Sequence, residues 1–118
     1  MVGTMDAPLK VVAGMPMYNE EETIGTVVTQ AMDHVDHVIC VDDGSSDSSA
    51  RIAEACGAIV HRHRVNRGYG GAMKSLFAKA REIDADCLVI LDSDGQHDAS
   101  DIPKIPVSYT HLTLPTNG

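Results

Sequence analysis

The sequence predicts an α/β fold in which a parallel sheet is covered by helices on both faces. Short apolar segments alternate with segments of helical periodicity, so that four strands are separated by three helices. This order implies parallel strands joined by right-handed helical crossovers. The strands are nearly continuous apolar runs, which is typical of strands buried on both faces. Aromatic residues make up only 3% of the chain and Trp is absent, so aliphatic side chains must fill the core.

The first half of the chain contains two expected strands and the helix between them. Residues 10–16 (KVVAGMP) and residues 37–42 (HVICVD) are predicted to be strands. Between them, Asn19 is the expected helix N-cap, and the three glutamates that follow it favour the positive end of the helix dipole. The apolar residues of this helix share one face at i, i+3, i+4 and i+7: Ile24, Val27, Val28 and Ala31.

The second half repeats the pattern. A helix is predicted to begin at an N-cap formed by Ser46 or Asp47. The third strand is expected at residues 58–62 (AIVHR), and the fourth at residues 87–92 (CLVILD). Between these strands, the glycine-rich residues 66–71 lead into a helix whose expected core face comprises Met73, Leu76, Phe77 and Ala80.

The last thirteen residues depart from this pattern. Residues 106–118 (PVSYTHLTLPTNG) contain no Asp, Glu, Lys or Arg and no amphipathic periodicity. They resemble translated adapter or vector sequence more than the continuation of a folded domain. The predicted domain therefore covers residues 1–105, and residues 106–118 are left out of the predicted fold as a tail of non-native appearance.

Composition and charge narrow the classes of partner. The formal net charge of −8 argues against broad binding to nucleic acid or to anionic membranes, which requires a basic surface. The three cysteines are an odd number without a CxxC motif, so we expect free thiols in a reducing compartment. No apolar run reaches the ~18 residues of a transmembrane helix, and the first residues do not resemble a signal peptide. These observations favour a cytoplasmic location.

The candidate ligand site follows from the fold class. In open parallel sheets, ligands bind beyond the carboxyl ends of the strands. This rule brings four segments to one edge of the predicted sheet: residues 16–20, 42–47, 65–71 and 92–97. The segments after the second and fourth strands both carry two closely spaced aspartates.

Asp92 and Asp94 end the fourth predicted strand as a DSD motif. Two carboxylates one residue apart repel each other unless a cation lies between them. Carboxylate oxygens suit Mg²⁺ or Mn²⁺, which commonly bind one or two carboxylates together with substrate phosphates. Gln96 is close enough in sequence to act as a further ligand. The alternative interpretation is a solvated acidic turn.

Three further stretches allow both a binding and a structural interpretation. In VDDGSSD (residues 41–47), a strand-end carboxylate can accept hydrogen bonds from a nucleobase or ribose, or the stretch can be a turn that caps a helix. NRGYGG (residues 66–71) allows close backbone approach to a phosphate at a helix start, or is a plain loop. We interpret HRHR (residues 61–64) as a solvated strand exit, with a phosphate contact as the alternative.

Four motifs together give a specific resemblance. PMYNEEETIG, VDDGSSDSS, NRGYGGAMKSLFAKA and LDSDGQHDASDIPKI occur in the same order in family 2 glycosyltransferases of the GT-A fold. The resemblance covers roughly residues 10–105 and is strongest to the dolichyl-phosphate mannosyltransferase and polyprenyl-phosphate sugar transferase group. It implies a Rossmann-like, nucleotide-binding half of a GT-A domain, truncated before the acceptor-binding half.

The resemblance also implies roles for individual residues. The donor, a GDP- or UDP-linked sugar, would be bound by ten residues: Pro16, Tyr18, Glu20, Asp42, Asp43, Arg67, Gly68, Asp92, Ser93 and Asp94. Asp42 or Asp43 would contact the base, and Arg67 and Gly68 would border the base or ribose. Asp92, Asp94 and Gln96 would hold Mg²⁺ or Mn²⁺ against the diphosphate.

The implied reaction is transfer of a hexose to an acceptor such as a polyprenyl phosphate, at the cytoplasmic face of a membrane in a full-length protein. The acceptor-side base of the family belongs to the second half, so we expect this chain to bind donor and to transfer little sugar. Two rival interpretations are a nucleotide-binding fragment without activity and a nucleotidyltransferase. The nucleotidyltransferase is disfavoured because the segment after the first strand is acidic, whereas such an enzyme requires a glycine-rich, basic loop there.

Overall fold

The structure confirms the predicted α/β fold. The computed structural model describes residues 9–91 and 109–111. Helices and strands alternate along the chain as expected, and a short fifth strand follows. The elements are β1 (Val11–Met17), α1 (Ile24–Met32), β2 (His37–Asp42), α2 (Ser49–Ala55), β3 (Ile59–Arg62), α3 (Gly68–Glu82), β4 (Cys87–Ile90) and β5 (Tyr109–His111).

The sheet has the strand order β3-β2-β1-β4-β5. The first four of these strands are mutually parallel, with β1 paired to both β2 and β4. β5 pairs antiparallel with β4, and Leu88 is the register partner of Thr110. β5 belongs to the segment that was left out of the predicted fold, so in this respect the prediction differs from the structure.

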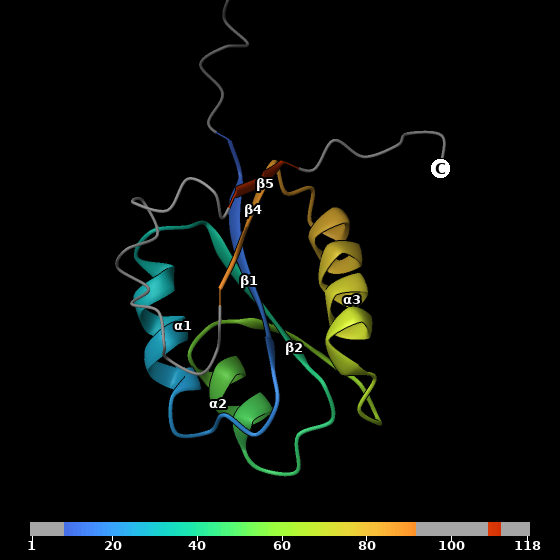
Figure 1. Cartoon of the computed structure of the whole chain (residues 1–118). Helices are drawn as coiled ribbons and strands as arrows, with labels where there is room; N and C mark the ends of the chain where they lie inside the picture. Colours follow the sequence, from blue (N-terminus) through green and yellow to red (C-terminus); the bar gives the residue numbers. More distant parts are fainter. Residues whose placement is uncertain (1–8, 92–108, 112–118) are drawn as a thin grey trace, which may run out of the picture.

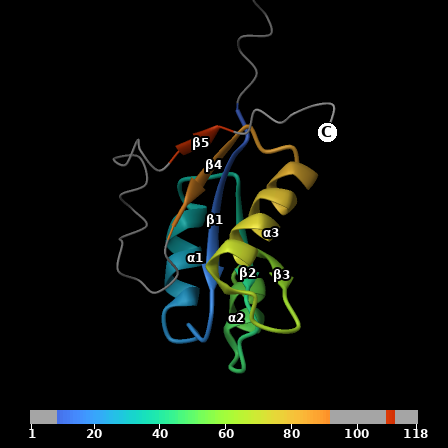
Figure 2. The ribbon, with the colours of Figure 1, turned by 45° about the vertical axis from the view of Figure 1, so that its right-hand side comes forward.

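Helices cover both faces of the sheet. α1 and α2 lie on one face and α3 on the other (Figure 1), and the turned view in Figure 2 shows the same layers. Alternate residues of each strand point to opposite faces. In β1, for example, Ala13 joins the core cluster under α1 and α2, whereas Val12 joins the cluster under α3. The predicted core face of α1 is fully confirmed, since all four of its residues are buried.

Close packing under α3 explains a glycine in the central strand. A Cβ atom at Gly14 would lie 2.5 Å from Cδ1 of Leu76, which is itself completely buried. The small residue therefore lets α3 approach β1. On α3, Ala72, Leu76 and Ala80 are buried, while Met73 and Phe77 of the predicted core face are only partly buried.

Both predicted N-caps on the first two helices were wrong. α1 begins at Ile24 with Thr23 as N-cap, and Asn19 lies four residues before that cap in a left-handed conformation with φ of 52°. α2 begins at Ser49 with Ser48 as N-cap, although the side chain of Asp47 accepts a hydrogen bond from the Ser49 N–H. For α1, the physical reason is that the side chain of Asn19 bonds to the N–H of Ser46 in the loop after β2.

Candidate functional site

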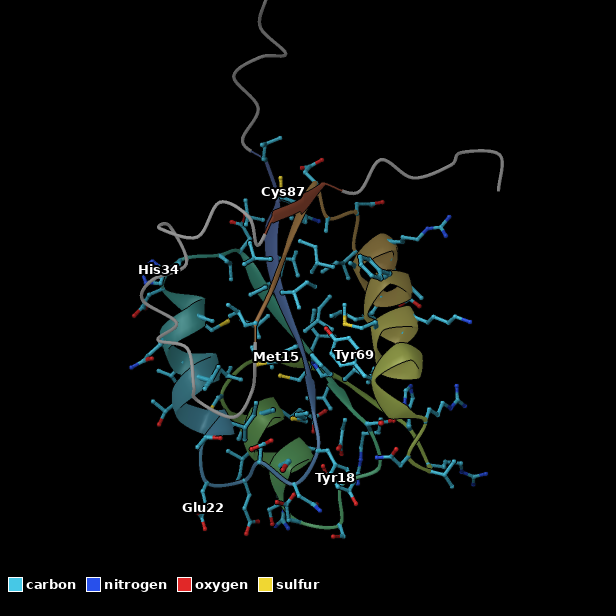
Figure 3. All side chains as sticks on the ribbon, viewed as in Figure 1. Met15, Tyr18, Glu22, His34, Tyr69 and Cys87 are labelled. Carbon is cyan, nitrogen blue, oxygen red and sulfur yellow. The ribbon has the colours of Figure 1, made fainter. Side chains whose placement is uncertain are left out.

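The carboxyl ends of the parallel strands meet at one edge of the sheet, as the fold class predicts. β1 ends at Met17 and β2 at the adjacent Asp42, which are register partners. In Figure 3, Tyr18 lies at this edge and Cys87, at the start of β4, lies at the opposite end of the sheet. The strand β4 runs to the same edge as β1, where the N–H of Leu91 donates to the carbonyl of Gly14 at 2.9 Å.

The predicted metal-binding segment lies outside the described residues. Asp92, Ser93, Asp94 and Gln96 directly follow Leu91 in the sequence. Within residues 9–91, no group of three or more His, Cys, Asp or Glu side chains is arranged to hold a metal ion. A metal site at this edge therefore stays a prediction from the DSD motif.

Reciprocal hydrogen bonds join the loop after β1 to the loop after β2. The N–H of Asn19 donates to Oγ of Ser45 at 2.8 Å, and Oδ1 of Asn19 accepts from the N–H of Ser46 at 2.9 Å. The N–H of Glu20 donates to Oγ of Ser49 at 2.7 Å. The left-handed backbone of Asn19 is one that Asn tolerates better than most residues. The two loops thus form one rigid wall of the edge.

Asp42 is the first of two buried carboxylates at the end of β2. Its side chain is completely buried, and Oδ1 accepts a hydrogen bond from the N–H of Ser45 at 3.0 Å. The Nε of Arg62 lies 3.2 Å from Oδ2, but not in hydrogen-bonding geometry, so Oδ2 has no hydrogen-bond partner among the described residues. A buried acceptor without a donor is costly. Asp42 therefore retains one buried oxygen, beside Arg62, that makes no hydrogen bond among the described residues.

Asp43 is buried too, and both of its oxygens are occupied. Oδ1 accepts from Nδ1 of His63 at 2.7 Å and from the N–H of Arg67 at 2.8 Å. Oδ2 accepts from the N–H of Gly68 at 2.9 Å. Burial raises the pKa of Asp43, but these hydrogen bonds outweigh it and hold the pKa below its ordinary value. The carboxylate thus anchors the start of α3 to the end of β2.

His63 is the residue whose environment the sequence analysis missed. It was expected in a solvated strand exit, but it is only 4% exposed. Its Nδ1 contacts Asp43, and its Nε2 lies 2.7 Å from Oγ of Ser75 on α3. Because an ionised carboxylate can only accept, Nδ1 of His63 carries a proton toward Asp43, and Nε2 is within hydrogen-bond distance of the Ser75 hydroxyl. The alternation of charge in HRHR gave no sign that one member points inward.

A pocket opens between the loop after β2 and the segment after β3. Its volume is about 390 Å³ and it is lined by Gly44, Ser45, Arg62, His63 and Arg64. Gly44 has φ of +87°, and a Cβ there would lie 2.9 Å from the backbone nitrogen of Asn66. The space above Gly44 is thus filled by the chain's own backbone, and the two arginines of the lining suit an anionic ligand.

The remaining predicted site residues lie around this edge. Pro16 and Glu20 are half-buried, whereas Tyr18 is 49% exposed. Arg67 and Gly68 are exposed, and their backbone N–H groups bind Asp43 directly. The structure therefore brings Asp43, Arg67 and Gly68 into contact.

These features define the class of the protein. The protein is a doubly wound α/β domain whose polar and charged side chains gather beyond the carboxyl ends of its parallel strands, where such folds bind their ligands. Residues 13–105 match the sequence profile described as Glycosyl transferase family 2. The chain belongs to this family.

Curated relatives are longer than this chain. It is 36% identical over 109 residues to a UDP-N-acetylglucosamine–dolichyl-phosphate N-acetylglucosaminyltransferase of Methanococcus voltae, covering 77% of this chain and 43% of that protein. It is 31% identical over 114 residues to an undecaprenyl-phosphate 4-deoxy-4-formamido-L-arabinose transferase of Proteus mirabilis, covering 88% and 35%. The chain thus spans less than half the length of these relatives.

Solved structures support the fold. Glucosyl-3-phosphoglycerate synthase from Mycobacterium tuberculosis, crystallised with Mn²⁺, UDP and glucosyl-3-phosphoglycerate, aligns with a TM-score of 0.61 and 27% identity over 78% of this chain and 36% of that one. Mannosyl-3-phosphoglycerate synthase from Rubrobacter xylanophilus aligns with a TM-score of 0.70 at 21% identity, over 85% and 36%. The GT-A class predicted from the sequence motifs is therefore confirmed.

Proposed function

We propose that this chain is the donor-binding part of a glycosyltransferase that transfers a hexose from a nucleoside-diphosphate sugar to an acceptor. One observation carries the proposal: Asp42, completely buried at the carboxyl edge of a family 2 glycosyltransferase sheet, has one oxygen that is ion-paired with Arg62 but makes no hydrogen bond among the described residues. That oxygen is suited to accept a hydrogen bond from a nucleobase N–H. The proposal is supported by a similar structure that was crystallised with UDP.

The other predicted donor residues take complementary parts. Pro16, Tyr18 and Glu20 line the β1 side of the nucleotide pocket. Arg67 and Gly68 border the base or ribose on the α3 side, with their backbone held by Asp43. Asp43 therefore acts on the nucleotide through the loop that it anchors.

A divalent metal, Mg²⁺ or Mn²⁺, completes the proposed site. Asp92 and Asp94 would hold it, with Ser93 between them and Gln96 as a further ligand, and their oxygen donors match the preference of these hard cations. When bound, the metal offsets the negative charge on the leaving diphosphate. The similar synthase structures contain Mn²⁺ or Mg²⁺ together with UDP.

The relatives support a proposal for the acceptor and the location. The names of two of them specify dolichyl or undecaprenyl phosphate, so we propose a polyprenyl phosphate acceptor and action at the cytoplasmic face of a membrane. Among the described helices, none has the length and apolar character needed to cross a bilayer. Association with the membrane would then rest on the acceptor or on other parts of a longer protein.

Calorimetric titration tests the proposal and identifies the base. UDP and GDP are titrated separately into the chain with Mn²⁺, and one of them is expected to bind. Asp42→Asn replaces one carboxylate oxygen by an amide donor and should weaken that binding about tenfold or more. Asp36→Asn, at the opposite end of the sheet beside Val11, is the matched control and should bind as the wild type does. Absence of binding by both nucleotides, or an unaffected Asp42→Asn variant, contradicts the proposal.

A second candidate function is nucleotide binding without transfer. It is favoured by the coverage of 43% and 35% of two transferases, which leaves most of their length unmatched. Release of sugar from UDP- or GDP-hexose, with and without Mn²⁺, separates the two functions. Turnover that requires the metal supports the transferase, whereas binding without turnover supports the second candidate.

A further inference from the structure

We propose that His63 is a positioning residue of the donor pocket, which acts by fixing the Asp43 carboxylate that holds the backbone at the start of α3. The inference rests on the proposed function, because the pocket is taken to bind a nucleotide. It concerns residues to which neither the family motifs nor the charge pattern assigned a role. His63 was expected to be solvated, and Ser75 was given no role.

The positioning path is a continuous chain of hydrogen bonds. Oγ of Ser75 on α3 lies 2.7 Å from Nε2 of His63, and Nδ1 of the same ring lies 2.7 Å from Oδ1 of Asp43. Asp43 then accepts from the N–H groups of Arg67 and Gly68 at 2.8 and 2.9 Å. The path starts and ends on α3, so the helix and the loop before it are fixed to the end of β2 at two points.

Burial makes the hydrogen bonds of this path hard to replace. Asp43 is 6% exposed and His63 is 4% exposed, so water cannot readily replace a lost partner. An imidazole ring has two nitrogens at a fixed separation, and here both are occupied. An apolar side chain of similar volume would fill the space but would leave the Asp43 carboxylate without its side-chain donor.

The path reaches the proposed nucleotide site through the backbone of Arg67 and Gly68, and His63 also borders a pocket at the same edge of the sheet. His63 lines the 390 Å³ pocket together with the two neighbouring arginines. The backbone at Asn66 packs against Gly44, where even a Cβ atom would come within 2.9 Å. The Nδ2 of Asn66 also donates to the carbonyl of Asp43 at 3.1 Å. A shift of Asp43 therefore moves the loop on which the pocket wall depends.

The Ser–His–Asp order resembles the triad of serine hydrolases, but its setting does not suit hydrolysis. Ser75 lies within α3, which runs from Gly68 to Glu82. Backbone N–H groups around it are used by the helix ladder and are not free to stabilise an oxyanion. The geometry points instead to a structural role, in which the positioning path holds the backbone beside the nucleotide site in place.

Two substitutions at His63 separate positioning from packing. His63→Leu keeps apolar volume and removes both ring nitrogens. His63→Asn keeps an N–H donor near the position of Nδ1 and gives up the contact with Ser75. The matched control is His37→Leu, which changes an exposed histidine at the other end of β2. Each variant is titrated with UDP and with GDP in Mn²⁺, and its ¹H–¹⁵N spectrum is recorded without nucleotide.

If His63 acts through the positioning path, His63→Leu should weaken nucleotide binding at least about tenfold and should shift the amide signals of Arg67 and Gly68. His63→Asn should restore binding to within about threefold of wild type, and His37→Leu should change neither readout. Equal losses for Asn and Leu, or unshifted amides in the Leu variant, overturn the proposal, because packing alone would then explain the residue.

A milder variant covers the case in which His63→Leu does not fold. Ser75→Ala removes only the hydroxyl that contacts Nε2, and it should still shift the two amide signals and weaken binding by a few-fold. An unchanged ¹H–¹⁵N spectrum together with an unchanged nucleotide affinity would refute the positioning path. If the wild-type chain binds neither nucleotide, the proposed function fails, while the amide signals still decide whether His63 fixes the loop.

Discussion

Asp43→Asn tests the central anchor of the site in the free protein. The substitution keeps the shape of the side chain and removes its charge. The amide oxygen can take the place of Oδ1 and keep the bonds from His63 and Arg67, but the amide nitrogen then faces the N–H of Gly68, and two donors cannot bond to each other. One hydrogen bond is lost and two become neutral.

The magnitude follows from these three bonds. A hydrogen bond to a charged group contributes about 1.5–3 kcal/mol, and a neutral one about 0.5–1.5 kcal/mol. Removing the buried charge recovers part of its desolvation cost. We therefore expect the free energy of unfolding to fall by about 3 kcal/mol, out of the roughly 5–15 kcal/mol typical of a domain.

Urea unfolding followed by far-ultraviolet circular dichroism measures this loss, since the chain has no Trp for fluorescence. Asp33→Asn, at an exposed position after α1, is the control and should change the stability by less than about 0.5 kcal/mol. The pKa of Asp43 is lowered in the folded state, so its stabilisation is complete above the ordinary aspartate pKa of ~3.9. It is lost as the pH falls from there through the lower, folded-state pKa. A loss below about 0.5 kcal/mol at neutral pH would refute the reasoning.

Three further outcomes are expected. Gly14→Ala should lower the free energy of unfolding, measured in urea, by about 1–3 kcal/mol, because the new methyl group meets Leu76. The double variant Gly14→Ala, Leu76→Ala should lose less stability than the sum of the two single variants, and additive losses would contradict the contact. Burial raises the pKa of the Cys40 thiol to about 12. At pH 8, Cys40 should therefore react with a thiol reagent far more slowly than the partly exposed Cys56, and equal rates would contradict the burial of Cys40. Asn19→Gly should retain the left-handed backbone and the N–H bond to Ser45 but lose the side-chain bond to the N–H of Ser46, lowering the unfolding free energy by about 1 kcal/mol. No change would show that this side-chain bond does not stabilise the joined loops.

The fold could be predicted because its signals are local. The strands are short apolar runs, and α1 buries the four residues that its 3.6-residue period selects. β2 was predicted with its observed bounds, His37–Asp42. β5 was not predicted, because its pairing with β4 is a long-range contact and its own sequence carries no periodic signal.

The site was less predictable because its contacts are also long-range. Asn19 has the composition of an N-cap, but its side chain bonds to the N–H of Ser46, twenty-seven residues away. Asp42 and Asp43 are neighbours with the same side chain. Among the described residues, Asp42 has one oxygen without a hydrogen bond, whereas Asp43 accepts hydrogen bonds from three donors. Sequence could place both at the strand end, but only the tertiary structure separates their environments.

The position of the metal tests the account most directly. Mn²⁺ is paramagnetic and broadens the amide signals of nearby residues, so a ¹H–¹⁵N spectrum of the chain with UDP or GDP reports where the ion binds. We predict selective broadening at the carboxyl edge, including Tyr18 and Leu91, with little effect at His37 and Cys87 at the far end of the sheet. The double substitution Asp92→Asn, Asp94→Asn should abolish that broadening. Broadening that is centred elsewhere, or that survives the double substitution, would contradict the proposed site.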